Sequence, residues 1–356
     1  MSNSSTRRRD VTVADVAKEA HVSKAQAARA LGGYGAVSDD VRERVMAAAE
    51  ELSYRPNELA RTMNTGRSHT IGVVVGDIEN PHFGLAMRGI SDTAKSAGFD
   101  VILINTGEDI TAEIDAVRVL LDKRVDGLIV APVSSPENQH LRRVSESGRP
   151  LVLFDRKVAG INVDVVAADM TAVARESTNY LIKAGHKRIA FISTLRSDEP
   201  YRHGTAITSS PIAERLDGMS LAFEEAGLPF LEDMVQLNAG DSSSIARITR
   251  KLVHGPSAAT AIVASDGLIA LGVVEAIQEM GMIIPRDISF LMYDDFSWTR
   301  LTAPPLSVIA QPVYDMGAAA ASLVIRRIQH PTAAVESPTF TATLVKRGSV
   351  GAATRP

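Results

Sequence analysis

The chain has 356 residues, of which 45% are hydrophobic and 22% charged, with a formal net charge of −4 and no cysteine. This length allows two or three domains with sizeable cores, and without cysteine there can be no disulfides or thiolate metal sites, which fits a reducing compartment. No apolar run approaches the roughly 20 residues that cross a bilayer, and no apolar segment follows the charges of the first ten residues, so we expect no signal peptide. We therefore predict a cytoplasmic protein without membrane contact, metal or cofactor.

The charges are unevenly distributed along the chain. Residues 1–68 hold 11 basic and 9 acidic side chains, whereas the remainder holds 27 and 33. A basic end joined to an acidic body is compatible with nucleic-acid binding, although the excess is small. We expect residues 1–10, which include three consecutive arginines, to form a flexible arm.

The segment VADVAKEAHVSKAQAARAL (Val13–Leu31) predicts two short helices joined by one tight turn. Thr12 can cap the first helix, with Asp15 three residues on, and Ser23 can cap the second, with Gln26 in the same relation. Because so short a turn forces the helices to cross steeply, the pair has the geometry of a helix-turn-helix. The second helix would enter a DNA major groove and present three outward side chains, Lys24, Ala25 and Arg29.

A third helix over Asp39–Leu52, with Ser38 as its cap, would complete a helical headpiece over residues 11–56. The helix cannot continue through Pro56, because a proline disfavours helical geometry in the residue before it. A further helix of seven residues follows, which is too short to be stable alone in water. We predict that residues 57–69 form a hinge and linker that becomes ordered only with a partner.

From Thr70 the pattern changes to apolar strands alternating with helices, which is typical of parallel α/β sheets. An internal similarity between SAGFDVILIN and EAGLPFLEDMVQLN indicates two similar lobes. We expect residues 70–347 to form them, the first lobe from about 70–166 and 295–330, the second from about 167–294 and 331–347, with a tail at 348–356. The predicted strands cover 70–75, 100–105, 126–131, 150–154, 187–193, 235–238, 260–264 and 287–293.

In open parallel sheets, ligands bind beyond the carboxyl ends of the strands. The side chains just past the predicted strand ends are mostly carboxylates and hydroxyls, with one arginine. Such groups can hydrogen-bond neighbouring hydroxyls of a polyol in pairs. They are Asp77, Thr106, Asp155, Arg156, Thr194, Asp241, Ser242, Ser265, Asp266, Asp294 and Asp295.

The run DVAKEAHVSKAQAARAL, followed by VRERVMAAAEELSYRPNELARTMNTGRSHTIGVV, resembles the DNA-binding end of the LacI family of bacterial transcription regulators. The similarity continues to about Val345 and so covers nearly the whole chain. It implies an N-terminal all-α helix-turn-helix headpiece and an α/β effector domain of two lobes with parallel sheets, like the periplasmic sugar-binding proteins. It also implies a repressor that binds double-stranded operator DNA as a homodimer.

The resemblance further implies particular contacts. In the family, hinge helices pair across a dimer in the minor groove and insert an apolar side chain between bases, a position held here by Met63. Other DNA contacts are expected from Thr12, Ser23, Lys24, Ala25, Gln26, Arg29, Tyr54, Asn57 and Arg61. The effector contacts correspond to His82, Phe83, Asp155, Arg156, Arg215, Asp241, Ser242, Ser265 and Asp294.

Departures from the family pattern leave the ligand and the operator open. Ser265 stands where the family usually has asparagine, and Met292 where it has glycine. Phe83 could stack on a sugar face or belong to the core, and the long loop 196–211 could fold over the cleft. The effector is expected to be a monosaccharide or a derivative, with a nucleoside, a purine or a phosphorylated metabolite acting as co-repressor as the alternative.

Two other functional classes were compared with a regulator. A transport-type solute-binding protein would share the two lobes but would have no headpiece. An enzyme would need a chemical motif, yet the sequence has no Gly-x-Gly-x-x-Gly after the first strand, no P-loop and no Gly-x-Ser-x-Gly. Both classes are therefore disfavoured. The absence of a leucine-heptad tail after Arg347 favours a dimer over a tetramer.

Overall fold

The computed structural model describes residues 11–32, 35–54 and 67–353. The chain forms two compact units, which divide between Ser68 and His69. The hinge predicted over residues 57–69 lies largely outside the described residues, as do Asn57, Arg61 and Met63. Within the described part of the chain, no helix has both the length and the apolar composition needed to cross a membrane.

The first unit contains the three predicted headpiece helices. Both predicted capping boxes are confirmed: Thr12 Oγ1 accepts from Asp15 N at 3.4 Å, and Ser23 Oγ accepts from Gln26 N at 3.2 Å. His21, in the turn between the first two helices, has a φ of 50°, a left-handed conformation that histidine tolerates better than most residues. The helices are α1 (Val13–Glu19), α2 (Lys24–Gly32) and α3 (Asp39–Glu51).

A small apolar core joins these helices. Val16 of α1, Ala27 of α2 and Val45 of α3 are fully buried and belong to the same cluster. Arg44 donates from Nη1 to the carbonyl oxygen of Ala20 at 3.1 Å, which links α3 to the end of α1. The core depends on residues close in sequence, so local patterning is sufficient to specify it.

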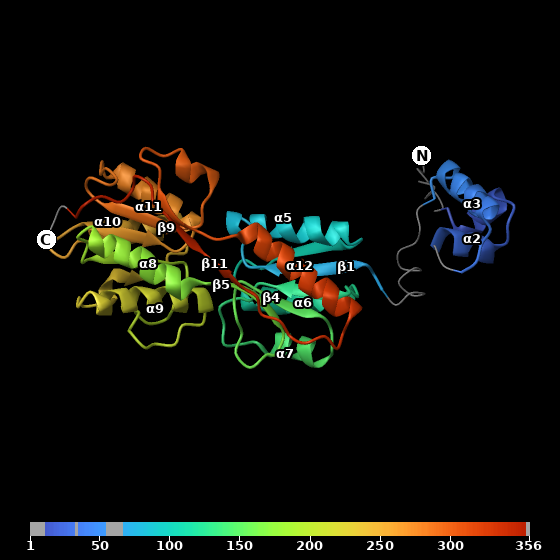
Figure 1. The fold of residues 1–356 in the computed structure, drawn as a ribbon, viewed down its shortest axis with the longest axis horizontal. Helices are drawn as coiled ribbons and strands as arrows, with labels where there is room; N and C mark the ends of the chain where they lie inside the picture. The colour runs from blue at the N-terminus through green and yellow to red at the C-terminus, as the bar shows by residue number, and fades with distance from the viewer. Residues whose placement is uncertain (1–10, 33–34, 55–66, 354–356) are drawn as a thin grey trace, which may run out of the picture. The chain divides into compact units, whose positions relative to one another are not determined.

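The second unit has two six-stranded sheets, each forming the centre of a lobe (Figure 1). In the first lobe the strand order is β11-β5-β4-β3-β1-β2, and the neighbouring strands are parallel. Its strands are β1 (Thr70–Val75), β2 (Asp100–Asn105), β3 (Gly127–Val130), β4 (Leu151–Phe154), β5 (Asp164–Asp169) and β11 (Thr339–Thr341). Its helices are α5 (Pro81–Ser96), α6 (Ile110–Asp122), α7 (Gln139–Glu146) and α12 (Val313–Gln329).

The second lobe repeats this arrangement with the order β12-β10-β9-β8-β6-β7. Here β12 is antiparallel to β10 and the other neighbours are parallel. The strands are β6 (Ile189–Ile192), β7 (Val235–Gln236), β8 (Ala261–Ala264), β9 (Ser289–Tyr293), β10 (Ser307–Ala310) and β12 (Thr343–Val345). The helices are α8 (Met170–Lys183), α9 (Ser210–Glu225), α10 (Ser242–Val253) and α11 (Gly267–Glu279), with short 3-10 turns at Glu232–Met234 and Ser297–Arg300.

The final segments cross between the lobes at places that differ from the prediction. We expected residues 295–330 in the first lobe, but β10 pairs with β9 in the second sheet, and only α12 returns to the first. We expected residues 331–347 in the second lobe, but β11 pairs with β5 in the first sheet before β12 pairs with β10. These strands have only three or four residues, so their sequence does not identify the sheet that they join.

Candidate functional site

One face of the second headpiece helix is exposed. Lys24, Ala25 and Arg29 all lie at the surface of α2, whereas its opposite face is buried in the headpiece core. The Arg29 side chain extends across Gly35, where an added Cβ would lie 3.3 Å from Arg29 Cδ. The three side chains predicted to face base edges are therefore exposed on one helix, as a helix that enters a major groove requires.

Other residues predicted to contact DNA take part in the headpiece's own structure. The Gln26 amide oxygen accepts from Ser23 N at 3.0 Å and Ser23 Oγ at 2.9 Å. Thr12 Oγ1 donates to Asp15 Oδ2 at 2.6 Å. Tyr54 is half-buried and packs against the apolar core. If the hydroxyls of Thr12 and Ser23 contact DNA phosphates, the same groups also cap a helix.

A cleft of about 670 Å³ lies between the two lobes, beyond the carboxyl ends of strands from both sheets. The structure brings all nine residues predicted to bind an effector to its lining: His82, Phe83, Asp155, Arg156, Arg215, Asp241, Ser242, Ser265 and Asp294. Three further residues from the strand-end rule, Asp77, Thr194 and Asp266, also line it.

Asp155 and Asp294 occupy equivalent positions in the two lobes. Asp155 follows β4 and Asp294 follows β9, and each of these strands is third in its sheet. Both residues have left-handed backbones, with φ of 65° for Asp155 and 72° for Asp294. The Asp155 N–H donates to the Val166 carbonyl oxygen of β5 and the Asp294 N–H to the Ile309 carbonyl oxygen of β10, both at 2.8 Å. The same local geometry thus presents one carboxylate from each lobe to the cleft.

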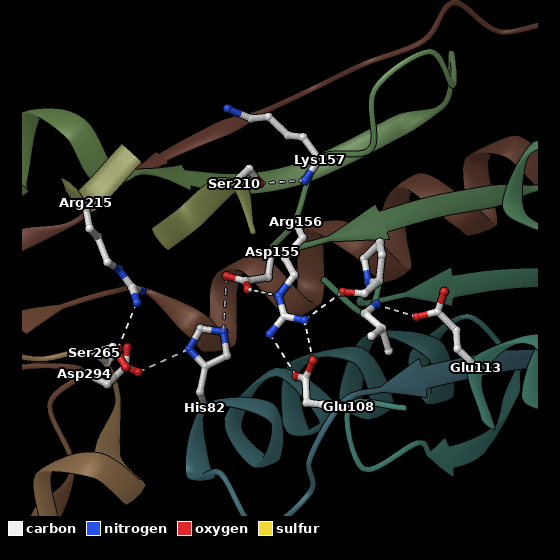
Figure 2. Close-up of polar contacts among 12 residues, drawn as sticks. His82, Glu108, Glu113, Asp155, Arg156, Lys157, Ser210, Arg215, Ser265 and Asp294 are labelled. Atoms are coloured by element: carbon white, nitrogen blue, oxygen red, sulfur yellow. Dashed lines mark hydrogen bonds and ion pairs between the residues drawn. The ribbon is translucent and has the colours of Figure 1, made fainter. Parts of the chain in front are cut away.

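His82 lies between these two carboxylates, as Figure 2 shows. Its Nδ1 is 3.5 Å from Asp294 Oδ2, and its Nε2 is 3.8 Å from Asp155 Oδ1. Burial by itself lowers the pKa of His82, but the attraction of the Asp294 and Asp155 carboxylates is stronger, so the pKa is raised above 6.5. Burial would raise the pKa of Asp294, yet His82 and Arg215 together hold it below its usual value.

Arg215 reaches the cleft from α9. Its Nη1 donates to the carbonyl oxygen of Ser265 at 2.9 Å, and its Cζ lies 3.9 Å from the centroid of the Tyr293 ring. These contacts fix the guanidinium plane. Its Nε is buried and has no hydrogen-bond partner, and the same is true of His82 Nε2. Two residues that line the cleft therefore each hold a buried polar atom without a hydrogen-bond partner, which is rare in folded proteins.

The Arg156 guanidinium is already engaged in an ion pair. It donates from Nη1 to Glu108 Oε2 at 2.7 Å and from Nη2 to Glu108 Oε1 at 2.9 Å, and also to the carbonyl oxygen of Pro132 at 2.8 Å. Glycine at position 76 leaves room for this pair, since an added Cβ there would overlap the Glu108 carboxyl. Arg156 therefore lines the cleft as half of a pair that sequence analysis did not predict.

The carboxylates on the second-lobe side cap helices. Asp241 caps α10, accepting from Ser244 N at 2.8 Å, and hydrogen bonds from Ser243 and Ser244 hold its pKa below its usual value. Asp266 caps α11 through Leu268 N and Ile269 N, both at 3.0 Å. Burial raises the pKa of Asp266. Both carboxylates still line the cleft, so each combines a structural role with exposure to a ligand.

Several residues singled out in the sequence take other positions. Phe83 is 4% exposed and belongs to the main core cluster while lining the cleft. Thr106 is buried and donates to the Val75 carbonyl oxygen at 3.2 Å, and Asp295 is paired with Arg347 at 2.6 Å. The last two residues are absent from the cleft lining, since their side chains are engaged in these internal contacts.

The loop 196–211 borders the cleft through some of its residues. Arg196, Ser209 and Pro211 are among the lining residues. Thr208 Oγ1 donates across the lobes to the Ser134 carbonyl oxygen at 3.4 Å. Sequence reasoning missed Ser134 and Glu108 as lining residues. A search window three residues beyond each strand end would have included Glu108, which follows Asn105 of β2.

The donor set of the cleft does not suggest a metal site. Within residues 11–32, 35–54 and 67–353, no three His, Cys, Asp or Glu side chains are grouped so that they could hold a metal ion. The cleft groups are instead arranged as hydrogen-bond donors and acceptors from two lobes. Such a site can enclose a polar molecule of several hydroxyls.

Comparison with known proteins gives matches over both units. Residues 12–57 match the description "Bacterial regulatory proteins, lacI family", and residues 68–347 match "Periplasmic binding proteins and sugar binding domain of LacI family". The chain is 31% identical over 324 residues to Catabolite control protein A of Priestia megaterium, covering 91% of this chain and 94% of that protein.

Two further matches concern a protein named for the ribose operon and a protein solved with bound ribose. The chain is 31% identical over 318 residues to the Ribose operon repressor of Halalkalibacterium halodurans, covering 89% of this chain and 90% of that protein. A crystal structure of a LacI family transcriptional regulator from Enterococcus faecium with bound ribose is 28% identical. It superposes with a TM-score of 0.68 and covers 80% of this chain and 99% of that one.

Proposed function

This chain belongs to the lacI family of bacterial regulatory proteins, and on that basis we propose how its two units work together. It is accordingly a DNA-binding transcription regulator whose activity is controlled by an effector, and its family consists of regulators rather than enzymes.

We propose that α2 binds in the major groove of the operator. Lys24, Ala25 and Arg29 would face base edges, with Arg29 able to form two hydrogen bonds to guanine and Ala25 to contact a thymine methyl group. The exposure of these three side chains supports the proposal. Phosphate and hinge contacts would come from Thr12, Ser23, Gln26, Tyr54, Asn57, Arg61 and Met63.

We propose that the protein binds DNA as a homodimer and represses transcription. One small DNA-binding module buries only about 600–1,000 Å² of protein surface on DNA, whereas specific complexes commonly bury more. Two copies would contact two half-sites of a roughly palindromic operator. Because the operator is part of the bacterial chromosome, the regulator would act in the cytoplasm.

The interlobe cleft is the proposed effector site, and one observation carries this proposal. His82 Nε2 and Arg215 Nε are buried without hydrogen-bond partners, beside carboxylates from both lobes. A sugar could satisfy them, since its adjacent hydroxyls can each donate and accept. A relative named for the ribose operon and another solved with bound ribose support a monosaccharide or a derivative as the ligand class.

Ligand binding would act through the contacts that join the lobes. Lys157, in the loop after β4, pairs through Nζ with Glu214 Oε1 of α9 at 2.8 Å, and its backbone N–H donates to Ser210 Oγ at 2.9 Å (Figure 2 shows the second contact). An effector that fits one degree of lobe closure better than another would favour that state. If the two states differ in DNA affinity, the effector changes that affinity, by about 5- to 150-fold in typical cases.

The experiment is fluorescence anisotropy with the protein's own upstream promoter DNA at fixed salt concentration. Arg29→Ala should weaken specific binding by about tenfold to a hundredfold for each half-site, the range for one two-hydrogen-bond base contact. Arg42→Ala is the matched control, because Arg42 is exposed on α3 and removes the same charge from the headpiece. Equal effects of the two variants would reject the assignment of α2 as the recognition helix.

A further inference from the structure

The lining of the cleft carries a large excess of acidic groups. Eight carboxylates and three guanidiniums line it, and His82 is the remaining ionisable group. The carboxylates are Asp77, Glu79, Glu108, Asp155, Asp241, Asp266, Glu275 and Asp294; the guanidiniums are Arg156, Arg196 and Arg215. Because the charges face one enclosed volume, they determine which ligand charge the site accepts.

The buried part of the lining has the same imbalance once internal pairs are removed. The two hydrogen bonds between Arg156 and Glu108 neutralise both groups. Asp155, Asp266 and Asp294 then remain beside Arg215 and His82, although Asp155 Oδ2 also lies 3.8 Å from Arg156 Nε. Only if His82 is protonated do the cationic groups approach the number of carboxylates. Even with Asp266 neutral, Asp155 and Asp294 match Arg215 and a protonated His82, so the buried lining has no excess cation for a ligand anion.

The environment of His82 suits the protonated imidazolium form. Asp155 follows β4 and Asp294 follows β9, and their carboxylates lie 3.8 and 3.5 Å from opposite ring nitrogens. Arg215, from α9, is the cation that opposes protonation. The side chain is 5% exposed, and its Nε2 lacks a hydrogen-bond partner. Since the imidazolium can donate from both nitrogens, the buried Nε2 can serve an acceptor oxygen of the ligand.

We propose that the cleft selects uncharged or amine-bearing polyols over phosphorylated or carboxylated ones because its carboxylates outnumber its cations, and that His82, held between Asp155 and Asp294, donates a hydrogen bond to the ligand. This inference rests on the proposed effector function of the cleft. A hydroxyl of the ligand would accept from His82 Nε2 and donate to a neighbouring carboxylate. An amine would be favoured by the excess negative charge. Among the described lining residues, Arg215 and Arg196 are the only cations without a carboxylate partner, so only they could bind a phosphate.

The first arm of the test measures selectivity with matched sugars. The probes are ribose and ribose 5-phosphate, glucose and glucose 6-phosphate, and galactose, glucosamine and gluconate, each titrated into the full chain by calorimetry. Every neutral or amino sugar that binds should do so at least about tenfold more tightly than its anionic counterpart, equivalent to 1.4 kcal/mol. An anionic sugar that binds as tightly as its parent would overturn the inference.

The second arm measures the protonation of His82 directly. The chain has eight histidines, and His82→Gln identifies the ring resonance of His82 by its loss from ¹H–¹³C NMR spectra. We expect this resonance to titrate with a pKa above 6.5, and Asp155→Asn to lower that pKa. Glu224→Gln, which removes an exposed carboxylate of α9, should leave it unchanged. A His82 pKa at or below 6.5 would overturn the proposed donation from both ring nitrogens of His82, but not the excess of carboxylates in the cleft.

The two arms separate failure of this inference from failure of the proposed function. If no sugar of any charge binds while His82 titrates above 6.5, the assignment of a sugar effector fails and the charge character of the cleft stands. If an anionic sugar binds best and alters DNA affinity, the effector function stands and the proposed selectivity is wrong. If His82 titrates at or below 6.5, the proposed role of its proton is wrong in either case.

Discussion

The headpiece and the two-lobed body differ in how their sequence specifies their structure. The headpiece core joins α1, α2 and α3, which follow one another closely along the chain. Capping boxes mark the starts of the first two helices. In the body, α12 near the end of the chain packs against α5 near its beginning. Local signals therefore suffice for the first unit, while the second depends on contacts between distant segments.

The largest expected effect tests whether the headpiece is a separate folding unit. Val16 is fully buried in the headpiece core, so Val16→Asp places an unpaired charge there and should cost several kcal/mol, enough to unfold a small domain. Specific DNA binding should be lost, while the body's melting transition in calorimetry stays in place. A body transition that falls together with the headpiece would contradict independent folding.

The next prediction concerns the close contact between α5 and α12. An added Cβ at Gly89 would lie 2.1 Å from the Tyr314 carbonyl oxygen, whereas one at Gly84 of the same helix would meet nothing within 4 Å. Gly89→Ala should therefore lower the body's free energy of unfolding by about 1–3 kcal/mol. Gly84→Ala, the matched control, should be neutral or slightly stabilising because alanine favours a helix. Urea denaturation measures both, and equal effects would contradict the close packing.

The same contrast explains how much of the molecule could be predicted from its sequence. The capping pairs and the longer strands were predicted because each leaves a local pattern; β1 and β2 have the predicted bounds. The short strands β10 and β11 were not assigned to the correct sheets, because their partners are chosen by tertiary pairing. In the cleft, the strand-end rule located Asp155 and Asp294, but the Arg156–Glu108 pair depends on the space at Gly76, which no local pattern reveals.

A smaller effect comes from the pH dependence of the body. Since the pKa of His82 is raised in the folded state, its contribution to stability is fully present below pH 6.5 and is lost as the pH rises through the folded pKa. The contribution amounts to about 1.4 kcal/mol for each pKa unit of the increase. The stability difference between wild type and His82→Gln should therefore shrink from pH 6 to pH 8.5 in urea titrations. A difference independent of pH would show that His82 does not titrate in this range.

The smallest effect distinguishes two helix starts within the headpiece. Thr12 forms a capping box on α1, whereas Ser38, the N-cap of α3, makes no side-chain capping hydrogen bond. Thr12→Ala should lower headpiece stability by about 1 kcal/mol and Ser38→Ala by less. Thermal unfolding followed by circular dichroism of the full chain compares the two. A larger loss for Ser38→Ala would reverse the assignment of the two caps.

The most direct test of the whole account is reciprocal linkage between the cleft and the operator. Operator affinity would be measured by anisotropy with and without a sugar that binds the body, and sugar affinity by calorimetry with and without operator DNA. We expect both affinities to change by the same factor. Arg215→Ala should weaken sugar binding and so abolish the change in operator affinity at a sugar concentration that suffices for wild type. A sugar that binds the cleft tightly but leaves operator affinity unchanged would contradict it.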